Sequence, residues 1–169
     1  MRKWVAGAIV AAACLTTAAF ALAGGREYMP VRQTPDMKTG FIERVAAEDG
    51  RYVLTIDEIK WYEGEEAAKI FRERESDSGL DAPPDGYYIV NDDSALTELP
   101  IAADAQVVMQ IYDKTGDITE AETAWDEPVS LETFVQQIKA DNGLHLDDFP
   151  YHLAVKDGQI VKIVQQFIP

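Results

Sequence analysis

The run GYYIVN at residues 86–91 predicts the strand around which the rest of the chain is organised. Alternation places Tyr87 and Ile89 on one face and Tyr88 and Val90 on the other, so both faces are apolar. A strand with two apolar faces is typical of a sheet that is covered on both sides. The proline pair just ahead of it makes a stiff entry, because proline fixes φ and has no N–H to donate. We therefore expect a core strand here and assign it no chemistry.

The first 23 residues have the features of a secretory signal peptide. Arg2 and Lys3 give a positive start, residues 4–20 are almost wholly apolar, and ALA at 21–23 has the small-x-small pattern that signal peptidase accepts. We expect cleavage after Ala23, which gives a secreted or extracytoplasmic protein with no transmembrane span.

Two alternatives for this leader stay open. The first is a retained membrane anchor, although the apolar stretch is alanine-rich and lacks positive charge on its far side. The second is a lipid anchor on Cys14, which follows three alanines but lacks the usual branched residue three places upstream and a polar tether after it. If cleavage follows Ala23, no cysteine remains, which excludes disulfides, thiol nucleophiles and thiolate metal sites.

The charge of the chain limits its partners. The formal net charge is −15, and the loss of Arg2 and Lys3 with the leader makes it two units more negative. Such a field repels nucleic acid and other polyanions. The expected partner is therefore an unknown protein or a neutral or basic ligand, and not nucleic acid; the oligomeric state does not follow from the sequence.

Residues 24–39 read as a flexible lead-in, and residues 40–169 as a single domain. Two strands at 41–47 and 51–56 flank Asp49-Gly50 and predict a hairpin with a two-residue turn. This register would set Val45 opposite Leu54, Ala47 opposite Tyr52 and Phe41 on the core face. The apolar phase changes after Ile56, which suggests a bulge at 57–58.

Further elements follow from periodicity and turn residues. Residues 65–75 predict a helix, 96–101 an edge strand or connection broken at Pro100, and 106–112 another strand. Ser130 is placed to cap a second helix that ends near Ala140 and has an apolar stripe. The stripe consists of Leu131, Phe134, Val135 and Ile138.

The chain ends in a second predicted hairpin, with strands at 151–155 and 160–167. A three-residue loop at 156–158, with Gly158 in the left-handed region, gathers one apolar face. That face consists of Tyr151, Leu153, Val161 and Ile163. About six mostly antiparallel strands and two helices predict an α+β domain with a strongly curved sheet or an OB-like partial barrel.

The residues give little support for catalysis or for metal binding. His145 and His152 lack zinc-ligand spacing, no serine lies in a nucleophile motif, and we expect no catalytic residue and no cofactor. The run DKTGDIT at 113–119 resembles a calcium loop only in part, because Ile118 stands where an EF-hand needs glycine. The weak candidates for a metal site are Asp113, Asp117, Asp92 and Asp93.

Trp125 is the candidate for partner binding. It lies among acidic residues in an aperiodic connection at 113–129, and connections of this length are usually functional or disordered. Two interpretations stay open: an exposed anchor for a basic or neutral partner, or a tryptophan that folds onto the core beneath the second helix.

The sequence resembles a family of uncharacterised exported proteins of Gram-positive bacteria. The resemblance rests on GYYIVND at 86–92, on Trp61 with GEEA at 64–67, and on VKDG at 155–158 with IVQQFIP at 163–169. It implies a location at the cell envelope or outside the cell. Residues 151–165 are also similar to the terminal hairpin of PepSY-type domains, which implies protease inhibition.

These observations favour a non-catalytic exported binding or accessory domain. The alternatives are a hydrolase that acts through carboxylates and a PepSY-like inhibitory module. A hydrolase would need two facing carboxylates, one of them with a raised pKa.

Overall fold

The computed structural model describes residues 30–141 and 143–168, so the expected signal peptide and the first six residues of the expected lead-in lie outside the described residues. None of the described helices is long and apolar enough to span a membrane. The elements in chain order are β1 (Met37–Glu48), β2 (Arg51–Glu63), α1 (Gly64–Arg74), β3 (Tyr87–Val90), β4 (Leu96–Met109), η1 (Ile118–Glu120), β5 (Glu127–Val129), α2 (Leu131–Lys139), η2 (Leu146–Asp148), β6 (Tyr151–Lys156) and β7 (Gln159–Gln165).

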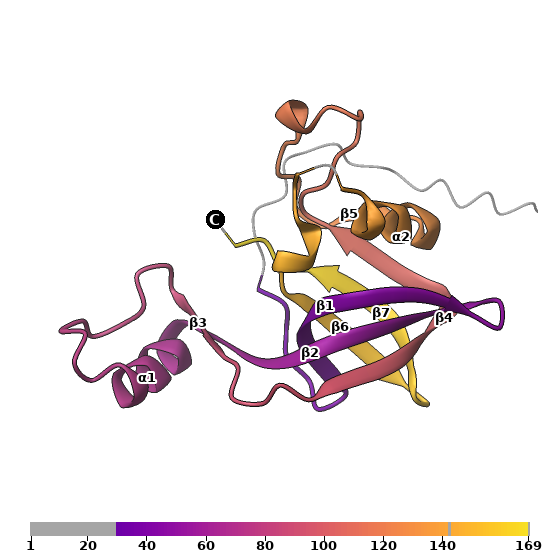
Figure 1. The fold of residues 1–169 in the computed structure, drawn as a ribbon. Helices are drawn as coiled ribbons and strands as arrows, with labels where there is room; N and C mark the ends of the chain where they lie inside the picture. Colours follow the sequence, from indigo (N-terminus) through magenta and orange to yellow (C-terminus); the bar gives the residue numbers. More distant parts are fainter. Residues whose placement is uncertain (1–29, 142, 169) are drawn as a thin grey trace, which may run out of the picture.

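Five strands close into a barrel (Figure 1). Around the barrel β1 pairs with β2, β2 with β4, β4 with β7, β7 with β6, and β6 with β1; only the β4–β7 pair is parallel. The helix α2 lies in the connection between β4 and β6. This arrangement is OB-like. It confirms the predicted α+β class with a strongly curved, mostly antiparallel sheet, and the barrel is closed rather than partial.

The first hairpin has the predicted turn. Residues 49–50 form the two-residue connection, and Val45 pairs with Leu54 as expected. Both turn residues have positive φ, the geometry that matches the twist of the flanking strands. Local sequence therefore sets this register.

The predicted bulge at 57–58 is wrong. The pairing of β2 with β1 is unbroken there, and the register shifts instead at Glu43 on β1. The shift places Ile42 on the core face at 3% exposure, whereas Phe41, which we expected there, is only half-buried. A bulge bends its strand and increases the twist, and here it helps β1 to curve around the barrel.

The second hairpin differs from the predicted loop. Its turn has two residues, 157–158, rather than the three expected at 156–158. Gly158 has a φ of +76°, as expected. A bulge at Val161 inserts the extra residue, so Leu153 still faces a buried isoleucine while Val161 itself turns away from the core.

The stretch that was expected to break at Pro100 is one continuous strand, β4. Pro100 lies opposite Val53 at the end of the pairing with β2, and from Ile101 onward β4 pairs with β7 instead. A proline is tolerated where ladder bonding changes from one neighbour to another, because its missing N–H leaves no donor unpaired.

The strand predicted to lie inside a sheet is an edge strand. In the described chain β3 pairs with β2 alone, beyond the barrel, and α1 packs beside it as a side extension (Figure 1). Its two apolar faces have separate causes: Tyr87 stacks on Trp61, whereas Tyr88 meets Phe71 of α1 edge to face. The helix at 65–75 is confirmed to within one residue.

The second helix is confirmed. The Ser130 side chain accepts a hydrogen bond from the Thr133 N–H at 3.0 Å, which satisfies one of the unpaired donors at the helix start. Phe134 is fully buried and meets Tyr151 edge to face, so α2 closes one end of the barrel core. β1 begins at Met37, so the last three residues of the expected lead-in belong to the barrel.

Candidate functional site

An aromatic cleft lies where the β2–β3 extension meets one end of the barrel. Its volume is about 480 Å³, within the range of ligand sites in proteins. The aromatic walls come from Trp61 on β2, Tyr87 on β3, Trp125 in the connection before β5, and Phe167 after β7. These four segments are far apart in the sequence.

One wall is the stacked pair of Trp61 and Tyr87. Their ring centroids are 4.6 Å apart at an interplanar angle of 12°. Trp61 lies opposite Ile89, and Tyr87, two residues before Ile89 on β3, is on the same face of the sheet. The ladder is prolonged by a hydrogen bond from the Gly64 N–H to the Gly86 carbonyl at 3.0 Å, and both glycines have a positive φ that other residues adopt only with strain.

The other wall is formed by Trp125 and Phe167. The two rings meet edge to face with centroids 6.0 Å apart, and Phe167 also stacks on Phe149. One buried residue, Gln110, fixes both parts of this wall. Its carbonyl accepts from the Ala124 N–H at 2.7 Å, and its side-chain Oε1 accepts from the Phe167 N–H at 2.9 Å.

Gln110 has a counterpart on the neighbouring strand. The Oε1 of Gln165, which is fully buried, accepts from the N–H groups of Gln110 and Ile111 at 2.8 and 2.9 Å. The two glutamines thus replace ladder hydrogen bonds where β4 and β7 separate. The backbone N–H groups of Gln110 and Ile111 therefore keep a hydrogen-bond partner. This allows both strands to end here and lead into the segments that form the cleft.

His152 lies behind the cleft, at 1% exposure. Its Nε2 lies 3.2 Å from the Gln166 Oε1, and its Nδ1 lies 3.0 Å from the Gln33 Nε2 and 2.9 Å from the Thr39 hydroxyl. The ring also meets Trp61 edge to face. Burial lowers the pKa of His152, against the raising effect of the Gln166 hydrogen bond and the Glu63 charge. A neutral ring with a structural role fits these contacts.

The polar groups of the cleft are mostly acidic. Glu63 and Asp85 line it beside Gln166. Burial and the Asp85 charge both raise the pKa of Tyr87, so its hydroxyl keeps its proton at neutral pH. Within the described residues Asp85 makes no ion pair and no hydrogen bond. The cleft therefore combines aromatic rings with negative charge.

Trp125 takes neither of the two expected positions. It is half-buried against Phe167 as part of a cleft wall, and it is not among the described residues that pack against the barrel core. The role of Trp125 in partner binding stays a prediction, and the structure places Trp125 beside Phe167 in the cleft.

The candidate metal ligands have partners within the protein. Asp92 pairs with Arg74 at 2.5 Å, and Asp93 accepts from the Ala95 N–H. Asp113 and Asp117 accept from backbone N–H groups of their own turn. Within residues 30–141 and 143–168 no three acidic, histidine or cysteine side chains come together as a metal site.

Three aromatic residues of the cleft, and the buried Gln110 that fixes one of its walls, were not predicted from the sequence as site residues. The sequence pattern places Tyr87 in a core strand, whereas Trp61, Phe167 and Gln110 receive no role as site residues from it. Phe167 lies in the motif that carries the family resemblance, but no local pattern shows that these side chains meet.

The shifted carboxyl groups do not suit acid catalysis. The pKa of Glu58 is lowered by hydrogen bonds from Lys38 and Thr97, which overcome the raising effect of its burial. The pKa values of Asp36, Asp92 and Asp117 are also lowered, each mainly by a side-chain hydrogen bond. A general acid of a glycosidase needs the opposite shift.

Comparison with family models, with curated proteins and with solved structures finds no match to this chain.

Proposed function

We propose that this protein is an exported, non-catalytic binding domain whose aromatic cleft takes an organic cation, such as an ammonium or guanidinium group. The observation that carries the proposal is the convergence of Trp61, Tyr87, Trp125 and Phe167 on one cleft with Glu63 and Asp85 beside them.

The chemistry of the cleft favours a positive charge. The faces of aromatic rings attract cations, most strongly on tryptophan. The carboxylate of Asp85 adds a charge that has no partner within the described residues, and the formal net charge of −15 adds a favourable long-range field. The family resemblance and the leader support export. The hydrolase and the PepSY-like inhibitor receive no such support, and we do not propose them.

Intrinsic fluorescence suits the test, because two of the three tryptophans line the cleft and the third, Trp4, belongs to the expected leader. We expect tetramethylammonium and arginine methyl ester to change the emission of the mature protein in a saturable way. Neutral isosteres such as neopentyl alcohol should have a much weaker effect. An arginine-rich peptide in parallel distinguishes a protein partner from a small cation.

A charge variant tests the role of Asp85. Asp85→Asn should weaken cation binding about 2- to 5-fold, the size of an exposed charge interaction. It should leave the binding of the neutral isostere unchanged. The matched control is Asp81→Asn, which lies in the same exposed linker but outside the cleft. Equal affinity for the cation and its neutral isostere would refute the proposal.

Export has a separate test. We expect the intact mass of the secreted protein to match a chain that starts at Gly24 without an acyl group. A chain that starts at a lipidated Cys14 would establish the lipoprotein alternative.

A further inference from the structure

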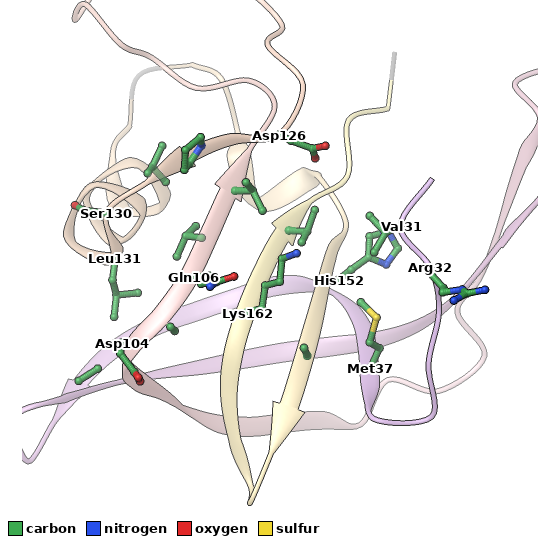
Figure 2. Close-up of a pocket in the computed structure, with 18 of the residues that line it drawn as sticks. Val31, Arg32, Met37, Asp104, Gln106, Asp126, Ser130, Leu131, His152 and Lys162 are labelled. Carbon is green, nitrogen blue, oxygen red and sulfur yellow. The ribbon is translucent and has the colours of Figure 1, made fainter. Parts of the chain in front are cut away.

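A groove of about 890 Å³ crosses the outer face of the barrel (Figure 2). Its floor is formed by β4, β7, β6 and the start of β1. One side is the extended segment 30–32, and the other is the stretch from β5 to the first turn of α2. Apart from Pro30, none of its residues lines the aromatic cleft.

The pairing of the strands sets the floor in two rows of outward-facing residues. The outer face of a barrel in water is normally polar, but here half of the residues in the two rows are apolar, as are most of the residues that line the groove, and Val164 is only 4% exposed. The first row is Val108, Val164, His152 and Thr39, and the second is Gln106, Lys162, Ala154 and Met37.

Lys162 is the cation of this floor. Figure 2 shows it in the middle of the groove, between Gln106 and His152. Its side chain makes no ion pair and no hydrogen bond within the described residues. Arg32 adds a second positive charge at one side, while acidic residues line the rest of the margin: Asp104, Asp126 and Glu132.

We propose that this groove binds the hydrocarbon chain of a fatty-acid-like amphiphile, and that its single carboxylate pairs with Lys162. The apolar majority of the lining residues favours a hydrocarbon over a fully hydrated ion. A central ammonium group favours an anion over a basic peptide. The acidic margin and the net charge of −15 disfavour ligands with several negative charges. A monoanion with a long apolar tail meets all three conditions.

Calorimetric titration of the mature protein with octanoate, decanoate and dodecanoate tests whether the groove binds the hydrocarbon chain. Full burial of a methylene group is worth about a fourfold change in Kd. We therefore expect each added pair of carbons to tighten binding by up to about 15-fold until the groove is filled. Val108→Asp places a carboxylate on the floor and should abolish the binding of decanoate and of decanol, with the circular dichroism spectrum unchanged.

A second comparison tests whether the carboxylate of the ligand pairs with Lys162. Lys162→Gln should weaken decanoate binding about 2- to 5-fold, as expected for an exposed ion pair, and leave decanol binding unchanged. Lys156→Gln, at the exposed end of β6, is the matched control and should change neither. Affinity independent of chain length, or an equal loss in both lysine variants, would overturn the proposal. So would a dimer in sedimentation velocity that Val108→Asp dissociates and decanoate leaves intact, because a second copy would then occupy the groove.

Discussion

Substitution of Gln110 tests whether a single buried amide holds one wall of the aromatic cleft. Gln110→Ala removes the Oε1 acceptor, which lies 2.9 Å from the Phe167 N–H, and leaves that partly buried donor unpaired. An unpaired buried donor costs about 1–3 kcal/mol. The loss of the buried γ-methylene group adds about 0.8 kcal/mol. We therefore expect the free energy of unfolding to fall by about 2–4 kcal/mol.

Urea denaturation measures this change. With a slope of about 2 kcal/mol/M, the midpoint should fall by about 1–2 M. The exposed Gln136→Ala on α2 is the control and should stay within about 0.5 kcal/mol of the parent protein. Because Gln110 also fixes the backbone beside Trp125, tryptophan emission in Gln110→Ala should shift to the red. A change below about 0.5 kcal/mol would refute the argument.

Three further predictions concern the barrel itself. Ser130→Ala removes the cap of α2 and should cost about 1 kcal/mol in chemical denaturation; an unchanged midpoint would show that the hydrogen bond to Thr133 contributes nothing. Gly158→Ala forces a side chain into a left-handed turn and should cost about 1–2 kcal/mol, whereas Gly158→Asn should cost less. The lowered pKa of His152 means that below a pH of about 6.5 the unfolded chain binds a proton that the folded protein does not. Stability should therefore be lost as the pH falls below about 6.5, and His152→Gln should show a shallower loss between pH 7 and 5 than the parent protein.

The parts of the fold that follow from sequence are those with local causes. An Asp-Gly turn sets its own backbone geometry, and Ser130 caps the helix that begins next to it. The bulges at Glu43 and Val161 have a different origin, because they let strands curve and align with partners that are distant in the sequence. The same reason explains Pro100, which is acceptable only because β4 changes neighbours there.

The edge position of β3 and the cleft could not be predicted for a related reason. Apolar residues on both faces of a strand indicate that both faces are covered. They do not indicate whether a sheet, a helix or a single side chain covers each face. Here Trp61 covers one face and α1 the other, so an edge strand has the pattern of a central one. Trp125 was identified from its place in a long connection, but its contact with Phe167 joins two segments that only the closed barrel brings together.

The position of β7 determines when the domain can fold during synthesis. This last strand lies between β6 and β4 and bonds to both. A nascent chain that lacks residues 159–165 has two open strand edges, which are templates for pairing with other chains. The β4–β7 contact also joins distant parts of the sequence, so it is slow to form. If the protein is exported, as we propose, the chain in a translocation channel stays open until β7 emerges, and the barrel closes only on the far side of the membrane.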